Sequence, residues 1–144
     1  MIACIFCDIL SGKAPANFVY RDELCAAFMD IHPVNPGHVL VVPFAHAELL
    51  SGVARETLGR MLWVAQQVNT AIRSSSLRCE GVNLFLADGQ AAGQEVMHVH
   101  LHVIPRFRGD GHHLRFSSAY FTLPSATELQ ANAQLIRDHM GDHP

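Results

Sequence analysis

The segment from Val96 to Ile104 constrains the fold more than any other part of the chain, and it reads Val-Met-His-Val-His-Leu-His-Val-Ile. Its histidines, His98, His100 and His102, alternate with aliphatic residues. Successive side chains on a β-strand point to opposite faces of the sheet. We therefore predict a strand over residues 97–104 that buries its aliphatic side chains on one face and presents three imidazoles on the other.

Two other interpretations of this pattern are a polar strand face without chemistry and one metal ion held by all three imidazoles. At about 3.3 Å per residue, the Cα atoms of His98 and His102 would lie about 13 Å apart. One zinc ion with Zn–N bonds of about 2 Å cannot easily take both. At least one imidazole is therefore left for other work. Histidine can act as a nucleophile or proton carrier near neutral pH.

The rest of the chain predicts an α+β domain in which a five-stranded, mostly antiparallel sheet carries two main helices. The remaining strands are expected at residues 17–20, 25–29, 38–42 and 81–87, and the helices at residues 55–73 and from Ser125 onward. A short helical turn is expected at residues 8–10. Ser125 and Glu128 have the spacing of a capping box. The length favours one domain over residues 1–144.

Composition argues against several classes of protein. Ten Lys and Arg against thirteen Asp and Glu give a formal net charge of −3, and no basic stripe indicates a nucleic-acid partner. No apolar run approaches the roughly 20 residues of a membrane span, so we expect no membrane partner. The N-terminus does not read as a signal peptide, which predicts a cytoplasmic protein.

Cys4 and Cys7 form a C-x-x-C pair close to the N-terminus. In a reducing compartment such a pair indicates metal or redox chemistry more than a disulfide. A redox pair normally follows a strand and opens a long helix, and no strand precedes residue 4. A closed zinc site would need two further ligands. Two reduced thiols without a metal are the remaining alternative. Cys25 and Cys79 stand alone and are expected to be inert.

Residues 98–104 fit the signature of the histidine triad (HIT) family, His-φ-His-φ-His-φ-φ, in which φ is apolar. The flanks of this segment, Gly93-Gln94 and Ile104-Pro105-Arg106, also match the family. Residues 28–31 and 36–41 resemble the segments that form the family's nucleoside pocket, and residues 4–10 resemble the N-terminus of its zinc-carrying bacterial branch. The resemblance covers about residues 4–106 and leaves residues 107–144 outside the motifs.

The resemblance implies a nucleotide hydrolase or nucleotidyl transferase. Such an enzyme acts at the α-phosphorus of purine nucleoside phosphate derivatives, such as phosphoramidates, adenylates or dinucleoside polyphosphates. His100 is then the nucleophile, and water cleaves the nucleotidyl-histidine that it forms. By the same resemblance, His102 contacts phosphate and aids the leaving group. His38 lies on the phosphate side of the pocket or behind it.

The resemblance also implies the substrate contacts. Asp30 would hold the ribose hydroxyls, because a carboxylate can accept from two hydroxyls. Backbone N–H groups around Gly93, Gln94 and Glu95 would hold phosphoryl oxygens. The Glu95 carboxylate is expected to point away from phosphate or to act on the leaving group. Ala87 stands where the family usually has Gln or Asn, so one phosphate contact is absent or supplied elsewhere.

For the C-x-x-C pair, the resemblance adds His46 and His98, so that Cys4, Cys7, His46 and His98 would hold one structural zinc ion per chain. It also implies a homodimer that extends the sheet across two chains. Two other functions stay open. One is a nucleotide-binding sensor or adaptor on the same fold with little turnover, which Ala87 favours. The other is a uridylyltransferase-like activity.

Overall fold

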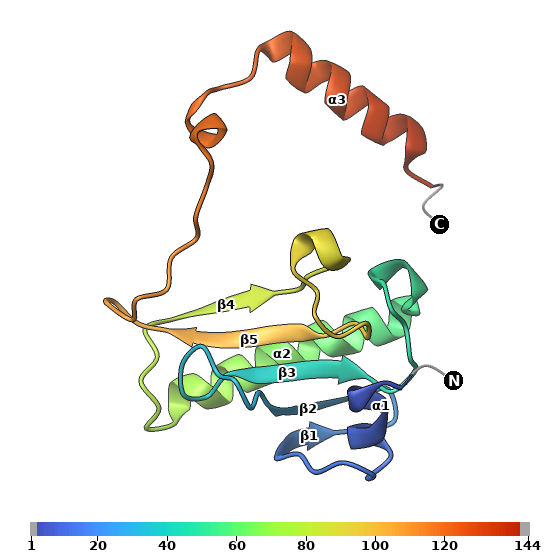
Figure 1. The fold of residues 1–144 in the computed structure, drawn as a ribbon, viewed down its shortest axis with the longest axis vertical. Helices are drawn as coiled ribbons and strands as arrows, with labels where there is room; N and C mark the ends of the chain where they lie inside the picture. Colours follow the sequence, from blue (N-terminus) through green and yellow to red (C-terminus); the bar gives the residue numbers. More distant parts are fainter. Residues whose placement is uncertain (1–2, 142–144) are drawn as a thin grey trace. The chain divides into compact units, whose positions relative to one another are not determined.

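The structure, a computed structural model, describes residues 3–141. The chain divides into two compact units, one up to His112 and one from His113 onward. The first unit holds the sheet and two helices, and the second holds one helix (Figure 1). No helix among the described residues is both long enough and apolar enough to cross a membrane.

The first unit is built on a five-stranded sheet with the order β1-β2-β3-β5-β4 and antiparallel neighbours throughout (Figure 1). The strands are β1 (Phe18–Arg21), β2 (Cys25–Met29), β3 (Val39–Pro43), β4 (Gly81–Phe85) and β5 (Leu101–Arg106). The turn between β1 and β2 is held by Asp22, whose carboxylate accepts from the N–H groups of Leu24 and Cys25. The predicted α+β class and five-stranded sheet are confirmed.

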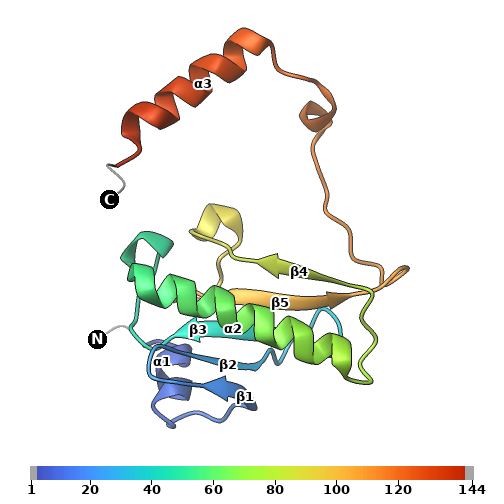
Figure 2. The same cartoon turned by 180° about the vertical axis from the view of Figure 1, so that it is seen from behind.

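The helices are α1 (Ile5–Leu10), α2 (Arg55–Ser74) and α3 (Ala126–His139). Figure 2 shows α2 across one face of the sheet, with α1 on the opposite face. Buried residues recur every three or four positions along α2, and the face that they form packs on β2, β3 and β5. On the other face, Phe6, Ile9 and Leu10 of α1 pack against Phe28 and Leu40. Helix α1 begins earlier than predicted because the Cys4 sulfur accepts from the Cys7 N–H.

The histidine-rich strand begins later than predicted, at Leu101 rather than at residue 97. The backbone before it pairs elsewhere: the Val99 N–H donates to the Ala47 carbonyl over 2.8 Å. The alternation of faces nevertheless holds. Val99 and Val103 join the core beneath α2, whereas the rings of His98 and His100 lie 5.9 and 5.1 Å from the Phe6 ring of α1. Strand β4 ends at Phe85, two residues earlier than expected.

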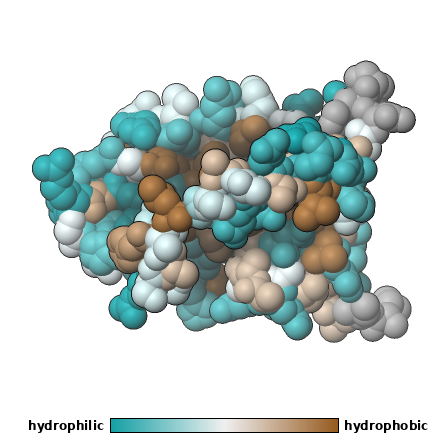
Figure 3. Space-filling view, turned by 90° about the horizontal axis from the view of Figure 1, so that it is seen from above, coloured by the Kyte–Doolittle hydropathy of each residue, from teal (hydrophilic) through white to brown (hydrophobic). Residues whose placement is uncertain are grey.

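The unit that starts at His113 carries α3, whose N-terminus is capped as predicted. The Ser125 hydroxyl accepts from the Glu128 N–H over 3.1 Å. The apolar residues of this helix are exposed, as Leu129 (55%) and Ile136 (64%) illustrate. Figure 3 shows apolar side chains that interrupt a mostly polar surface. The apolar face of α3 is therefore not buried within its own unit.

The packing of α2 on the sheet gives a stability prediction. Met61 is 2% exposed, and truncating it leaves a cavity between α2 and the sheet. We expect Met61→Ala to lower the free energy of unfolding in urea by about 2–5 kcal/mol. Gln66→Ala on the exposed side of the same helix should change it by less than about 0.5 kcal/mol. Equal effects of the two substitutions would contradict this account of the core.

Candidate active site

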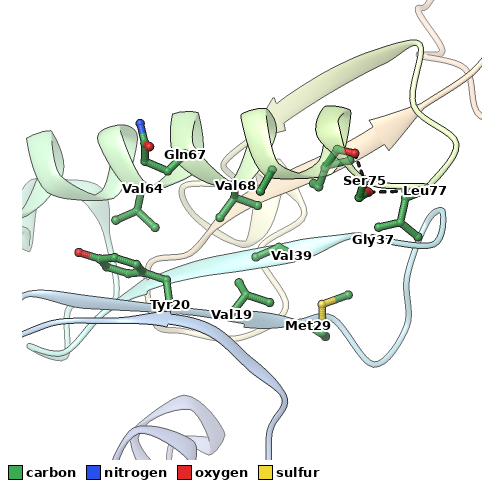
Figure 4. A pocket seen from close by; sticks show the side chains of 12 residues that line it. Val19, Tyr20, Met29, Gly37, Val39, Val64, Gln67, Val68, Ser75 and Leu77 are labelled. Carbon is green, nitrogen blue, oxygen red and sulfur yellow. Dashed lines mark hydrogen bonds between the residues drawn. The ribbon is translucent and has the colours of Figure 1, made fainter.

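Two cavities of the first unit were compared with the predicted site residues. The cavity between α2 and strands β1–β3 has a volume of about 320 Å³ and is almost entirely apolar (Figure 4). The Ser75 hydroxyl at its rim already donates to the Ile72 carbonyl over 2.7 Å and accepts from the Leu77 N–H over 3.1 Å. None of the site residues predicted from the sequence lines this cavity, so it is not the candidate site.

The second cavity has a volume of about 550 Å³. It is lined by residues of α1, of strands β2–β5 and of the loop before the triad. It brings together most of the side chains that the sequence singled out: Asp30, His38, Gly93, Glu95, His100 and His102. Apolar walls complete it, including Phe28, Leu40 and Phe85. An apolar cavity with a few convergent polar groups is the usual form of a small-molecule site.

The His100 imidazole has one nitrogen committed and one free. Its Nδ1 lies 2.7 Å from the His98 carbonyl oxygen, so Nδ1 carries the proton and donates. The neutral ring then keeps a lone pair on Nε2. The Phe6 ring packs edge-on against the imidazole, and the residue is only 6% exposed. His100 is therefore held with a nucleophilic nitrogen in a fixed orientation.

The neighbouring His102 has the opposite tautomer. The Val34 N–H donates to His38 Nδ1 over 3.0 Å, which places the His38 proton on Nε2. His38 Nε2 lies 2.8 Å from His102 Nδ1 and donates to it. The proton of a neutral His102 must then be on its Nε2. Two adjacent imidazoles thus offer a lone pair at His100 and an N–H donor at His102.

The imidazoles of His102 and His38 are both neutral near pH 7. Burial, followed by the nearby His100 and His38, lowers the pKa of His102 to about 4. Burial also lowers the pKa of His38 from its ordinary value, more than the Asp30 carboxylate raises it. The 3.5 Å contact between His38 Nε2 and Asp30 Oδ2 is therefore not an ion pair between two charges. His102 is suited to donate a hydrogen bond rather than to carry a positive charge.

Asp30 is anchored to its own loop by one oxygen. Oδ1 accepts from the His32 N–H over 2.8 Å, and Oδ2 faces His38. The carboxylate is 17% exposed and lines the cavity. Because each carboxylate oxygen has two acceptor positions, Asp30 keeps capacity for hydroxyl groups of a ligand.

The loop before the triad differs from expectation at two predicted substrate-binding residues. The Gly93 N–H donates to the Gln90 carbonyl and the Gln94 N–H to the Gly89 carbonyl. Gly93 has φ of 90°, a conformation that favours glycine. These two N–H groups close a turn and are not free for phosphate. Over the range 3–141, neither the Glu95 N–H nor the Val96 N–H donates a hydrogen bond, and both residues line the cavity, so these are the backbone donors that the loop leaves there.

The Gln94 side chain does not line the cavity but connects loops within the protein by hydrogen bonds. It is 5% exposed, donates to the carbonyls of Glu48 (2.7 Å) and Val96 (3.0 Å), and accepts from the Gly89 N–H. The Gln94 side chain is therefore committed to main-chain partners within the protein. Ala87 is also buried, and it is not among the lining residues.

Sequence reasoning missed the network that closes the far end of β5. Asp110 accepts from Arg106 over 2.6 and 2.9 Å and from Asn35 Nδ2 over 2.8 Å. These hydrogen bonds, the one from Arg106 first, hold the pKa of Asp110 well below its ordinary value. The network fixes the turn that leads into His38. The four-residue spacing of Arg106 and Asp110 was the one signal in the sequence.

A second cluster lies where α1 meets the loop after β3. The ligand atoms of Cys4, Cys7, His46 and His98 all lie within 4.8 Å of one another. Tetrahedral zinc, with Zn–S near 2.3 Å and Zn–N near 2.0 Å, separates its ligand atoms by about 3.3–3.8 Å. The contacts Cys4–His98, Cys7–His46 and Cys7–His98 measure 3.3, 3.4 and 3.6 Å, and His46–His98 measures 3.2 Å. The group fits a metal ion.

His98 has the tautomer that a metal ligand needs. Its Nε2 lies 2.9 Å from the Pro43 carbonyl and donates to it, which leaves the lone pair on Nδ1 facing the two sulfurs. Burial lowers the pKa of His98, so the ring is neutral. The three histidines of the triad thus have different surroundings: His98 lies with the two cysteines, and His100 and His102 line the cavity.

Comparison with known proteins finds similar sequences and similar structures. A model of the HIT domain matches residues 11–109. A HIT-like protein of Borreliella burgdorferi is 44% identical over 112 residues, which are 77% of this chain and 81% of the relative. An Arabidopsis thaliana protein named adenylylsulfatase HINT3 is 32% identical over 107 residues, 74% of this chain and 54% of that protein.

Two solved structures have the same fold. The crystal structure of a HIT family member from Bacillus subtilis has a TM-score of 0.85 at 30% identity and covers 99% of this chain and 100% of its own. A zinc-bound histidine triad family protein from Mycobacterium smegmatis has a TM-score of 0.74 at 39% identity, with 95% and 98% covered.

The buried neutral imidazoles predict loss of stability in acid. Between about pH 6.5 and pH 4, His102 is protonated in the unfolded chain but neutral in the folded chain. The free energy of unfolding therefore rises with pH across this window. We expect this one group to remove about 1–3 kcal/mol from the free energy of unfolding as pH falls through it. In denaturant titrations at several pH values, the free energy of unfolding of His102→Gln should change less steeply with pH than that of the wild type. An unchanged slope would contradict the neutral state of His102.

Proposed function

The chain belongs to the HIT domain family, and on that premise we propose that it is an enzyme that cleaves purine nucleoside phosphate derivatives at the α-phosphorus. At the level of the family, this membership and the relative named adenylylsulfatase support nucleotide hydrolase or transferase chemistry. The proposed substrates are nucleoside phosphoramidates, adenylates and dinucleoside polyphosphates.

The observation that carries this proposal is the free Nε2 lone pair of His100 in a cavity large enough for a nucleotide. In the first step Nε2 forms a bond to phosphorus while the bond from phosphorus to the leaving group breaks. The leaving group departs with the electron pair and takes a proton from water at the cavity mouth. In the second step water forms the P–O bond, the P–Nε2 bond breaks, and the remaining proton of that water returns to solvent. Attack through histidine replaces one difficult displacement by two easier ones.

The other cavity residues have roles that follow from their hydrogen bonds. His102 Nε2–H and the Glu95 N–H would donate to phosphoryl oxygens, whose negative charge grows as the nucleophile approaches. His38 would act through His102 by holding its tautomer. Asp30 would accept from the ribose hydroxyls, and the apolar wall around Phe28 and Leu40 would contact the base.

We also propose that the cysteine and histidine cluster holds one structural zinc ion per chain, with Cys4, Cys7, His46 and His98 as ligands. The spacing of the ligand atoms and the zinc-bound Mycobacterium smegmatis relative support this metal. Bound zinc would tie α1 to the segment that precedes β5. The proposed chemistry at His100 takes no step through the metal.

A second copy of the chain is the proposed macromolecular partner, in a cytoplasmic homodimer. Strand β4 is an edge of the sheet, and its Leu84 and Phe85 are each 45% exposed. An exposed apolar edge strand is a template for pairing with another chain. Edge pairing through β4 would extend the sheet across the two copies.

The nucleophile gives the first functional prediction. His100→Ala should lower the rate of AMP release from adenosine 5′-phosphoramidate by about a thousandfold or more, because the attacking atom is lost. His113→Ala, at an exposed histidine outside the cavity, should release AMP at the wild-type rate. Mass spectrometry after an acid quench should find the nucleotidyl group on His100. Equal rates for wild type and His100→Ala would favour the alternative function, a nucleotide sensor with little turnover.

The metal site gives a separate prediction. Elemental analysis should find about one zinc ion per chain, and Cys4→Ser should lose it together with several degrees of thermal stability, because the ion joins two elements. Cys79→Ser is the matched control, since Cys79 lies outside the cluster and serine can keep its bond to the Gly81 carbonyl. A metal-free protein of unchanged stability would exclude the structural zinc.

A further inference from the structure

The candidate active site has an unusual charge for a nucleotide site. Its ionisable lining residues are the carboxylates Asp30 and Glu95 and four histidines, and no Lys or Arg lines it within the described chain. His38 and His102 are neutral at pH 7, because burial lowers the pKa of each. The cavity therefore offers N–H dipoles to a phosphate but no permanent positive charge.

Glu95 lines the cavity, and the residues beside it fix its backbone. The Gln94 amide bonds to the carbonyls of Glu48 and Val96, so the backbone on both sides of Glu95 is fixed. Glu95 itself is exposed, and among residues 3–141 it forms no ion pair that would neutralise it. Within the described residues its N–H, like that of Val96, donates no hydrogen bond, so Glu95 combines a backbone donor with a carboxylate.

These charges treat two kinds of leaving group differently. One negative charge at the α-phosphate can be held by the N–H donors of Glu95 and His102. Additional phosphates would place further negative charge near two carboxylates with no cation to compensate it. An ammonium group on the leaving group would instead be attracted by the Glu95 carboxylate.

We infer that Glu95 determines specificity by favouring leaving groups that carry a positive charge and disfavouring those that carry further negative charge. This inference rests on the proposed function. It narrows the substrate class to nucleoside phosphoramidates whose departing amine bears a second, cationic amine. Dinucleoside polyphosphates are then poor substrates.

The test uses adenosine 5′-phosphoramidates that share the same P–N bond. Their amines carry a four-carbon chain that ends in an ammonium, a methyl or a carboxylate group. The measurement is kcat/KM for each compound with the wild type, Glu95→Gln and Glu95→Ser. Glu23→Gln is the matched control, because it removes the same charge from an exposed residue between β1 and β2 that does not line the cavity.

We expect the wild type to prefer the ammonium compound over the carboxylate compound by about tenfold or more, and to lose part of this ratio as salt is raised. Both Glu95 variants should reduce the ratio by about tenfold, whereas Glu23→Gln should keep it. An unchanged ratio in the Glu95 variants, with turnover retained, would overturn the inference and leave the proposed function standing. Absence of turnover of all three compounds by the wild type would overturn both.

Discussion

The position of protons on buried imidazoles is the constraint on which the rest of the site depends. A neutral imidazole has one N–H and one lone pair, so a fixed partner at one nitrogen decides what the other can do. Main-chain groups supply these partners: the Pro43 carbonyl for His98, the His98 carbonyl for His100, and the Val34 N–H for His38. Burial keeps the rings of His38 and His98 neutral, and without neutrality the assignment of lone pairs would be lost.

The extended segment that carries the triad joins two different chemical environments. His98 uses its side chain in the cysteine cluster and its carbonyl to hold the proton of His100. His102, two residues after His100, accepts a hydrogen bond from His38, which immediately precedes β3. The alternation of side chains along this segment therefore places neighbouring imidazoles on one face, while different hydrogen-bond partners make each of them chemically distinct.

Much of this architecture could be predicted from the sequence, because periodicity and capping are local signals. The strand at residues 25–29, the long helix and the Ser125 cap all follow from short patterns. The backbone pairing of Val99 with Ala47 and the internal bonds of Gln94 were not predictable, because they join loops far apart in the sequence. A glutamine beside a glycine carries no mark that tells a substrate contact from an internal staple. The same limit hid Val34, whose contribution is a main-chain N–H that any residue except proline would provide.

The main-chain origin of the partners around His38, His98 and His100 has a consequence for how the site tolerates change. A carbonyl or an amide hydrogen is present whatever side chain its residue carries, so a point substitution rarely deletes it. The walls of the cavity can then be redesigned, by laboratory selection or by gene divergence, while the protonation pattern stays in place. A scaffold of this kind separates the inheritance of reactivity from the evolution of selectivity.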